Sequence, residues 1–93
     1  MTVFAKDPSS TLDYSFDWTN WLAPGEAILS GVWTVVPSDA GAPALAAETL
    51  AGAITAVNVA GGTVNSRYRL GCQITTDSGR TAERSTALRV MEV

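Results

Sequence analysis

The stretch Leu12-Asp13-Tyr14-Ser15-Phe16-Asp17-Trp18 alternates large apolar side chains with polar ones over seven consecutive positions. Successive side chains of a β-strand point to opposite sides, so the four large side chains share one face and the two carboxylates share the other. The stretch therefore predicts a half-buried strand over residues 11–18, with its aromatic face in the core and its aspartates in water.

The rest of the chain predicts further short strands, with turn signals about every ten residues. We expect strands over 27–36, 53–59, 67–75 and 84–92. Residues 44–51 predict a strand or irregular structure, with a short helix as the alternative. The expected core consists of apolar residues of inward parity: Leu12, Tyr14, Phe16, Trp18, Trp33, Tyr68, Leu70, Cys72, Ile74, Leu88 and Val90, with Leu29 and Val35 from the second strand.

Turn signals separate these strands. Thr19 or Asn20 is expected to cap a single helical turn, which Pro24-Gly25 ends with a tighter turn. Residues 76–80 predict a hairpin turn in which Gly79 takes a positive φ. Tyr68 follows a Gly-rich crossing and is expected to bond back to the corner backbone, with a plain core aromatic as the alternative.

These features together predict an all-β fold, an immunoglobulin-like sandwich of six or seven short antiparallel strands. Pro8 restricts Asp7 to extended conformations, so residues 1–10 are expected to form an extended N-terminal arm. Residues 11–93 are expected to form the single sandwich domain.

The charge of the chain is low and unevenly distributed. Only 16% of residues are charged and the net charge is −3, which disfavours a general nucleic-acid binder. Residues 1–66 hold one lysine and six acids, whereas residues 67–93 hold five arginines and three acids. Either these acidic and basic strands lie near each other in one fold, or they make head-to-tail contacts between copies or with an oppositely charged partner. Arg67 and Arg69 share a face and are expected to pair with carboxylates on an adjacent strand, or else to bind an acidic surface.

The sequence offers little for catalysis. It has no histidine and one cysteine, so a zinc site and an activated thiol are not expected. Asp13 and Asp17 would lie about 13 Å apart along one strand, too far for the carboxylate pair of a glycosidase. No apolar run is long enough for a membrane span, and no signal pattern opens the chain. We expect a protein that is not an enzyme, with no cofactor, metal, small-molecule substrate, nucleic acid or membrane as its partner.

Trp21 and Leu22 lie on the turn outside the alternating strand, which makes them candidate contacts with a partner. The alternative for Trp21 is a plug at the end of the core. Lys6, Asp7 and Pro8 in the arm are further candidates, because an extended arm can add a strand to a neighbour's sheet.

Several segments resemble a known family. Lys6-Asp7-Pro8, the alternating strand, Trp21-Leu22, Gly25-Glu26 and the segment Ile74–Thr81 are similar to small tailed-bacteriophage virion proteins of the fibre–tail adaptor type. The resemblance spans nearly the whole chain and is weakest over residues 37–58. It implies an immunoglobulin-like structural module that docks a tail or fibre component to the particle. Its partners would be other phage structural proteins and copies of itself, in a virion assembled in the host cytoplasm. A head decoration protein and a carbohydrate- or ligand-binding module remain the alternatives.

Overall fold

The computed structural model describes residues 3–92, except the side chain of Val3, and within them it contains seven strands and no helix. The predicted all-β class is confirmed. The strands are β1 (Val3–Lys6), β2 (Thr11–Asp17), β3 (Ile28–Val36), β4 (Ala44–Ala51), β5 (Ile54–Ala60), β6 (Arg67–Thr76) and β7 (Thr81–Val90).

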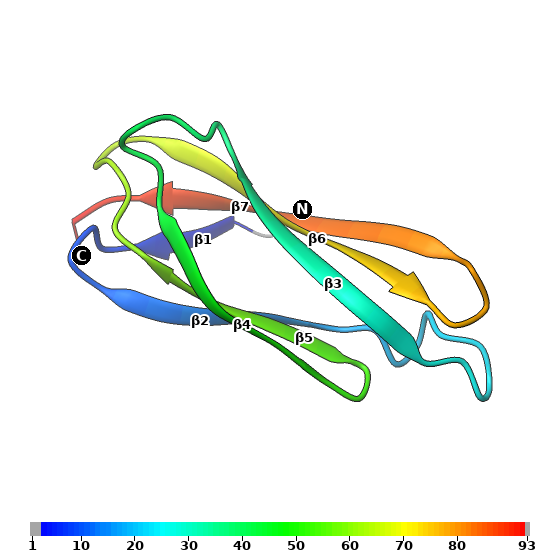
Figure 1. Ribbon diagram of the computed structural model, residues 1–93. Coiled ribbons are helices and arrows are strands. Elements are labelled where there is room, and N and C mark those ends of the chain that lie inside the picture. Colours follow the sequence, from blue (N-terminus) through cyan, green and yellow to red (C-terminus); the bar gives the residue numbers. More distant parts are fainter. Residues whose placement is uncertain (1–2, 93) are drawn as a thin grey trace.

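The strands form two sheets, one with the order β1-β7-β6-β3 and the other with the order β2-β5-β4. All pairings are antiparallel except the parallel pairing of β1 with β7. The molecule is elongated, with extents of 43 × 22 × 22 Å. Figure 1 shows the β2–β3 connection and the β6–β7 hairpin at one end, and the β1–β2, β3–β4 and β5–β6 connections at the other.

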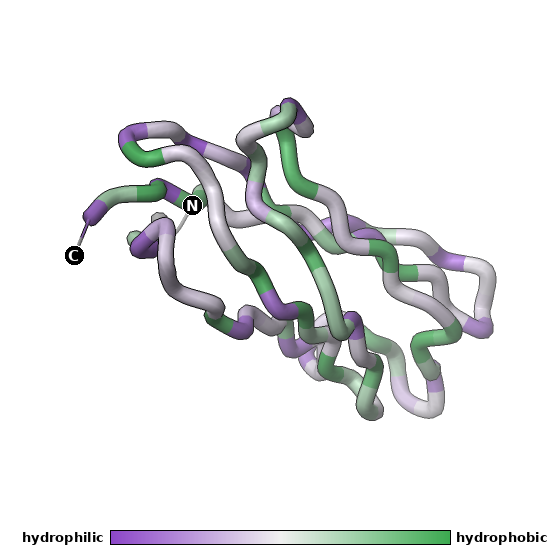
Figure 2. Tube along the Cα trace, turned by 60° about the vertical axis from the view of Figure 1, so that its left-hand side comes forward, coloured by the Kyte–Doolittle hydropathy of each residue, from purple (hydrophilic) through white to green (hydrophobic). Residues whose placement is uncertain are grey.

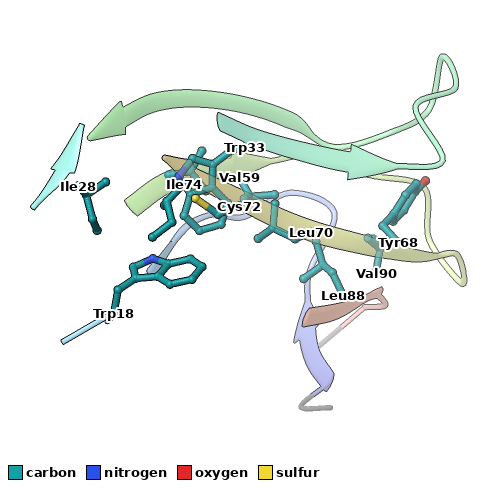
Figure 3. Close-up of a cluster of buried hydrophobic side chains, with 11 residues drawn as sticks. Trp18, Ile28, Trp33, Val59, Tyr68, Leu70, Cys72, Ile74, Leu88 and Val90 are labelled. Carbon is teal, nitrogen blue, oxygen red and sulfur yellow. The ribbon is translucent and has the colours of Figure 1, made fainter. Parts of the chain in front are cut away.

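The core lies between the two sheets, where both contribute inward-facing side chains (Figure 3). The buried apolar residues are Trp18, Ile28, Trp33, Val57, Val59, Tyr68, Leu70, Cys72, Ile74, Leu88 and Val90. Asp13 and Asp17 are exposed, which confirms the predicted orientation of β2. Figure 2 shows the corresponding short alternations of hydrophobic and hydrophilic residues along the strands. Most of the core therefore follows from the period of two in the sequence.

The aromatic face of β2 is less buried than predicted. Leu12 is 40% exposed, so its assignment to the core is wrong, and Tyr14 and Phe16 are half-buried. The reason is that β2 is the edge strand of its sheet, and the facing edge strand β1 has only four residues. The short β1 leaves this side of the core partly open.

The second predicted strand contains a β-bulge that alternation alone does not reveal. Ile28 pairs with Thr76 and Ser30 pairs with Thr75, which leaves Leu29 as the extra residue. One extra residue reverses the parity of everything before it. Leu29 is therefore 64% exposed rather than in the core, and Ile28 is buried in its place. Val35, beyond the bulge, keeps its inward parity and is half-buried.

Residues 44–51 form strand β4, so the helical alternative is wrong. Pairing with β5 prevails over the helix propensity of the alanines, since short helices are marginal without tertiary support. A second irregularity lies between Ala46 and Thr49, where Ala47 has a φ of 53°.

Residues 1 and 2 of the predicted arm lie outside the described residues. Residues 3–6 are extended, but they pair with residues 87–90 of β7 in the molecule's own sheet. The carbonyl of Lys6 also accepts a hydrogen bond from the N–H of Met91 at 2.9 Å. Within the described residues, the start of the chain is therefore an edge strand of this fold. The division of the chain at residue 10 stays a prediction.

Candidate interaction surfaces

The connection between β2 and β3 begins with one helical turn. The carbonyl of Trp18 accepts hydrogen bonds from the N–H groups of Trp21 (2.9 Å) and Leu22 (3.1 Å). The predicted turn is present, but its capping residue is Asp17, whose carboxylate accepts from the N–H of Thr19 (3.0 Å) and from its hydroxyl (2.6 Å). These bonds to Thr19 lower the pKa of Asp17.

The same connection ends in the predicted Pro-Gly turn. The N–H of Glu26 donates to the carbonyl of Ala23 at 3.0 Å. Gly25 has a φ of 79°, which the third position of a type II turn requires. The turn places the side chain of Glu26 against the β6–β7 hairpin.

Glu26 joins the two loops at this end of the molecule. Its side chain is only 3% exposed and pairs with the guanidinium of Arg80. It also accepts from the hydroxyls of Thr76 (2.6 Å) and Ser78, and from the N–H of Ala23 (2.9 Å). The bonds from Arg80, followed by those from the two hydroxyls, hold the pKa of Glu26 far below its usual value.

Trp21 packs against Arg80, a member of this network. The guanidinium carbon of Arg80 lies 4.1 Å from the centre of the Trp21 ring, and the ring packs edge-on against Trp18 at 5.9 Å. Trp21 and Leu22 are both half-buried and pack against the core cluster. We call this set of residues 18–26 and Arg80 the tryptophan turn. Its predicted contact with a partner stays a prediction.

Lys6 is fully buried. Its Nζ donates to three carbonyls, those of Asp7 (2.9 Å), Ser10 (2.6 Å) and Gly61 (2.8 Å). Burial lowers the pKa of Lys6, and the nearby charge of Asp7 partly offsets this effect. Lys6 thus ties the β1–β2 turn to the β5–β6 connection.

A partner at residues 6–8 could not contact the side chain of Lys6, because this side chain has no exposed surface in the isolated chain. Asp7 and Pro8 are half-buried. The carboxylate of Asp7 accepts from the N–H (2.8 Å) and the hydroxyl (2.6 Å) of Ser9. Any partner contact in this segment must fall on Asp7 and Pro8, a prediction that stays open.

The outer surface of the larger sheet carries three exposed arginines, Arg67, Arg69 and Arg89, which we call the arginine face. Arg67 pairs directly with Arg89 across the strands, and Arg69 lies between Ala87 and Val36. The predicted pairing of Arg67 and Arg69 with carboxylates on an adjacent strand is wrong. The spacing of Arg67 and Arg69 in the sequence predicts that they share a face. That Arg89 lies on the same face follows only from the register of β6 with β7.

An apolar groove of about 430 Å³ opens between β1 and β2. Phe4, Leu12, Tyr14 and Phe16 contribute to its lining. The Tyr14 hydroxyl is buried, and among the described residues it has no hydrogen-bond partner; burial raises its pKa. This groove is the opening that the short edge strand β1 leaves over the aromatic face of β2.

Residues 3–92 show no group of three or more carboxylates or thiols placed to hold a metal ion. In the same part of the chain, no helix is long and apolar enough to cross a membrane.

A comparison with models of protein families gives a match. The model of a family described as podophage GP4 fiber-tail adaptor protein gp77 matches residues 6–89. No curated protein matches the chain. The matched range runs from the last residue of β1 almost to the end of β7, so it includes both sheets and also residues 37–58. The chain therefore belongs to the family of the podophage GP4 fiber-tail adaptor protein gp77.

Proposed function

We propose that this protein is a non-enzymatic structural component of a tailed-phage virion that docks a fibre or tail component to the particle. The observation that carries this proposal is the family match over residues 6–89. Because the match includes both sheets, it concerns the whole fold rather than one motif. The proposal places the protein in the virion, with other phage structural proteins as its partners.

We further propose that the fold is immunoglobulin-like. The orders β2-β5-β4 and β7-β6-β3 correspond to the B-E-D and G-F-C sheets of immunoglobulin domains. The Tyr68 hydroxyl accepts from the N–H of Thr63 and donates to the carbonyl of Gly41, both at 3.2 Å. These bonds support a tyrosine corner at the start of β6.

The elongated shape supports an adaptor that contacts two partners. The tryptophan turn lies at one end of the 43 Å long axis, and the β1–β2 turn with Asp7 and Pro8 lies at the other (Figure 1). We propose that one end contacts the fibre component and the other contacts the tail. A rigid sandwich then sets the distance between the two partners.

The test at the tryptophan turn is the substitution Trp21→Ala. A partner anchor truncated to alanine costs about 2 kcal/mol or more in binding, whereas loss of a large core aromatic costs about 3–5 kcal/mol in folding. If Trp21 is an anchor, the variant melts like the wild type but is lost from particles. The matched control is Leu29→Ala, which truncates a residue that is 64% exposed at the same end of the molecule. It should change neither the melting temperature nor the incorporation into particles.

Particles assembled without the protein test the function itself. An adaptor predicts particles with intact heads that lack the docked fibre or tail component, as seen by electron microscopy and protein composition. A head decoration protein predicts fragile heads with complete tails, which would overturn the proposal. The ligand-binding alternative rests on exposed tryptophans that could stack on sugars, but Trp18 and Trp33 are buried and Arg80 covers the Trp21 ring.

A further inference from the structure

The chain has six basic side chains, and the fold uses three of them internally. Lys6 donates to three carbonyls, Arg80 pairs with Glu26, and Arg84 donates to the carbonyl of Asp17 at 2.7 Å while its guanidinium lies over the Trp18 ring. The three that remain are the members of the arginine face. None of them has a hydrogen bond or an ion pair with any residue between 3 and 92.

The arginine face is costly for the isolated chain. Arg67 and Arg89 lie directly opposite each other on neighbouring strands, and like charges in that arrangement repel. Val36 on β3 pairs with Arg69 on β6. Val36 is 59% exposed and adds an apolar side chain to the same surface. Glu83 is exposed on the same outer face of β7 and lies beside Gly71, but it makes no ion pair with the three arginines. A basic surface with an exposed apolar side chain and no internal ion pair fits an acidic protein surface.

Such a surface exists on the other side of the same chain. Strand β2 carries Asp13 and Asp17 on the outer surface of the smaller sheet, both exposed. Asp17 caps the tryptophan turn, whereas Asp13 has no ion pair or hydrogen bond within the described part of the chain. Asp13 and Asp17 therefore lie on the outer surface opposite the arginine face, so these side chains do not meet within one copy. At the end of the molecule the acidic and basic parts of the chain do meet, since Glu26 pairs with Arg80 and Arg84 lies against Asp17.

We propose that the arginine face of one copy docks on the acidic outer surface of β2 in a second copy. The contact joins two different surfaces, so each copy offers one of each and association is head-to-tail. Arg69 and Asp13 are the central pair. A nucleic acid is the other polyanion to consider, but a protein with a net charge of −3 and three clustered arginines offers phosphates a small footprint.

The experiment is sedimentation equilibrium of the purified full chain at low and high salt. Ionic screening shortens the range of electrostatic contact from about 10 Å at 0.1 M to about 3 Å at 1 M salt, so the wild type should associate at low salt and dissociate at high salt. Arg69→Glu and Asp13→Lys should each weaken association on the order of tenfold or more. Glu92→Lys changes the charge as Asp13→Lys does, at an exposed residue outside both surfaces, and should leave association unchanged.

Mixing the two variants tests the geometry. The Asp13→Lys copy keeps its arginine face and the Arg69→Glu copy keeps its acidic surface, and the two substituted side chains have opposite charges. An equimolar mixture should therefore associate, whereas each variant alone should not. A wild type that is monomeric at low salt, or a mixture that shows no dimer, would overturn the inference. So would wild-type monomers that instead bind duplex DNA through the arginine face. The adaptor role is tested separately, by the composition of particles assembled without the protein.

Discussion

At the scale of single residues, Lys6 shows how burial of a charge can serve the fold. An ammonium has three N–H donors, and all three reach backbone carbonyls here. The carbonyls belong to the β1–β2 turn and to the β5–β6 connection, so one side chain holds two loops together. Removal of the ammonium would leave three acceptors without this donor in a buried place.

We therefore expect Lys6→Met, which keeps the length of the side chain, to lower the free energy of unfolding by about 3 kcal/mol or more. The measurement is denaturant-induced unfolding followed by tryptophan fluorescence. Arg89→Met also removes one positive charge, but at an exposed residue, and should change stability by no more than about 0.5 kcal/mol. Equal stability of the two variants would show that the bonds of Lys6 contribute nothing.

Glu26 makes stability depend on pH. Its pKa is lowered in the folded protein, chiefly by Arg80, so the unfolded chain takes up a proton on this group at higher pH than the folded chain does. The stabilisation is thus complete above the unfolded pKa of about 4.3 and is lost as the pH falls below it. We expect Glu26→Gln to be less stable than the wild type at neutral pH, with the difference shrinking in acid. A constant difference between pH 7 and pH 3 in unfolding titrations would contradict this account.

At the scale of the elements, Thr55 connects the two sheets through the core. Its hydroxyl on β5 accepts from the indole N–H of Trp18 at 3.1 Å and from the thiol of Cys72 on β6 at 3.5 Å. All three residues are buried. A buried polar contact of this kind is favourable only while each donor keeps its acceptor.

The expected effect of Thr55→Val is a loss of about 1–3 kcal/mol, because the Trp18 N–H is left unpaired. The same substitution in a Trp18→Phe background should cost about 1 kcal/mol less, since the donor is then absent. Unfolding free energies of the four proteins in this cycle give the coupling. A coupling of zero would mean that the bond between Thr55 and Trp18 does not contribute.

At the scale of the whole molecule, Cys72 reports on cooperativity. It is the sole cysteine of the sequence and is fully buried near the middle of the core (Figure 3), where burial raises the pKa of its thiol. A thiol reagent can reach it only when the two sheets separate, so its labelling should follow global opening.

We expect labelling of Cys72 in native buffer to be slower than in the unfolded chain by the unfolding equilibrium constant, roughly 10³–10⁸ for a domain of this kind. A loss of about 3 kcal/mol in Lys6→Met should then speed labelling about a hundredfold. Labelling that is fast and insensitive to Lys6→Met would reveal a local opening at β6 instead of a cooperative core.

The sequence alone determined most of the strands, the residues of most of them that face the core, and the turns, because these depend on near neighbours along the chain. It left residues 44–51 open and did not reveal β1. The period of two places Trp18, Leu70 and Leu88 correctly, and Pro24-Gly25 marks its turn without help from distant residues. These features need only the alternation of side chains along a strand and the φ angles that proline and glycine favour.

The tertiary structure alone decided which strands are neighbours and which strands are edges. The edge position of β2 exposes Leu12, and the bulge in β3 exposes Leu29, although both residues follow an apolar alternation. The parallel pairing of β1 with β7 buries Lys6, and the register of β6 with β7 brings Arg67 to Arg89. These outcomes depend on contacts between residues far apart in the chain. The free energy that selects strand neighbours and register comes from these contacts, so a local sequence pattern does not reveal it.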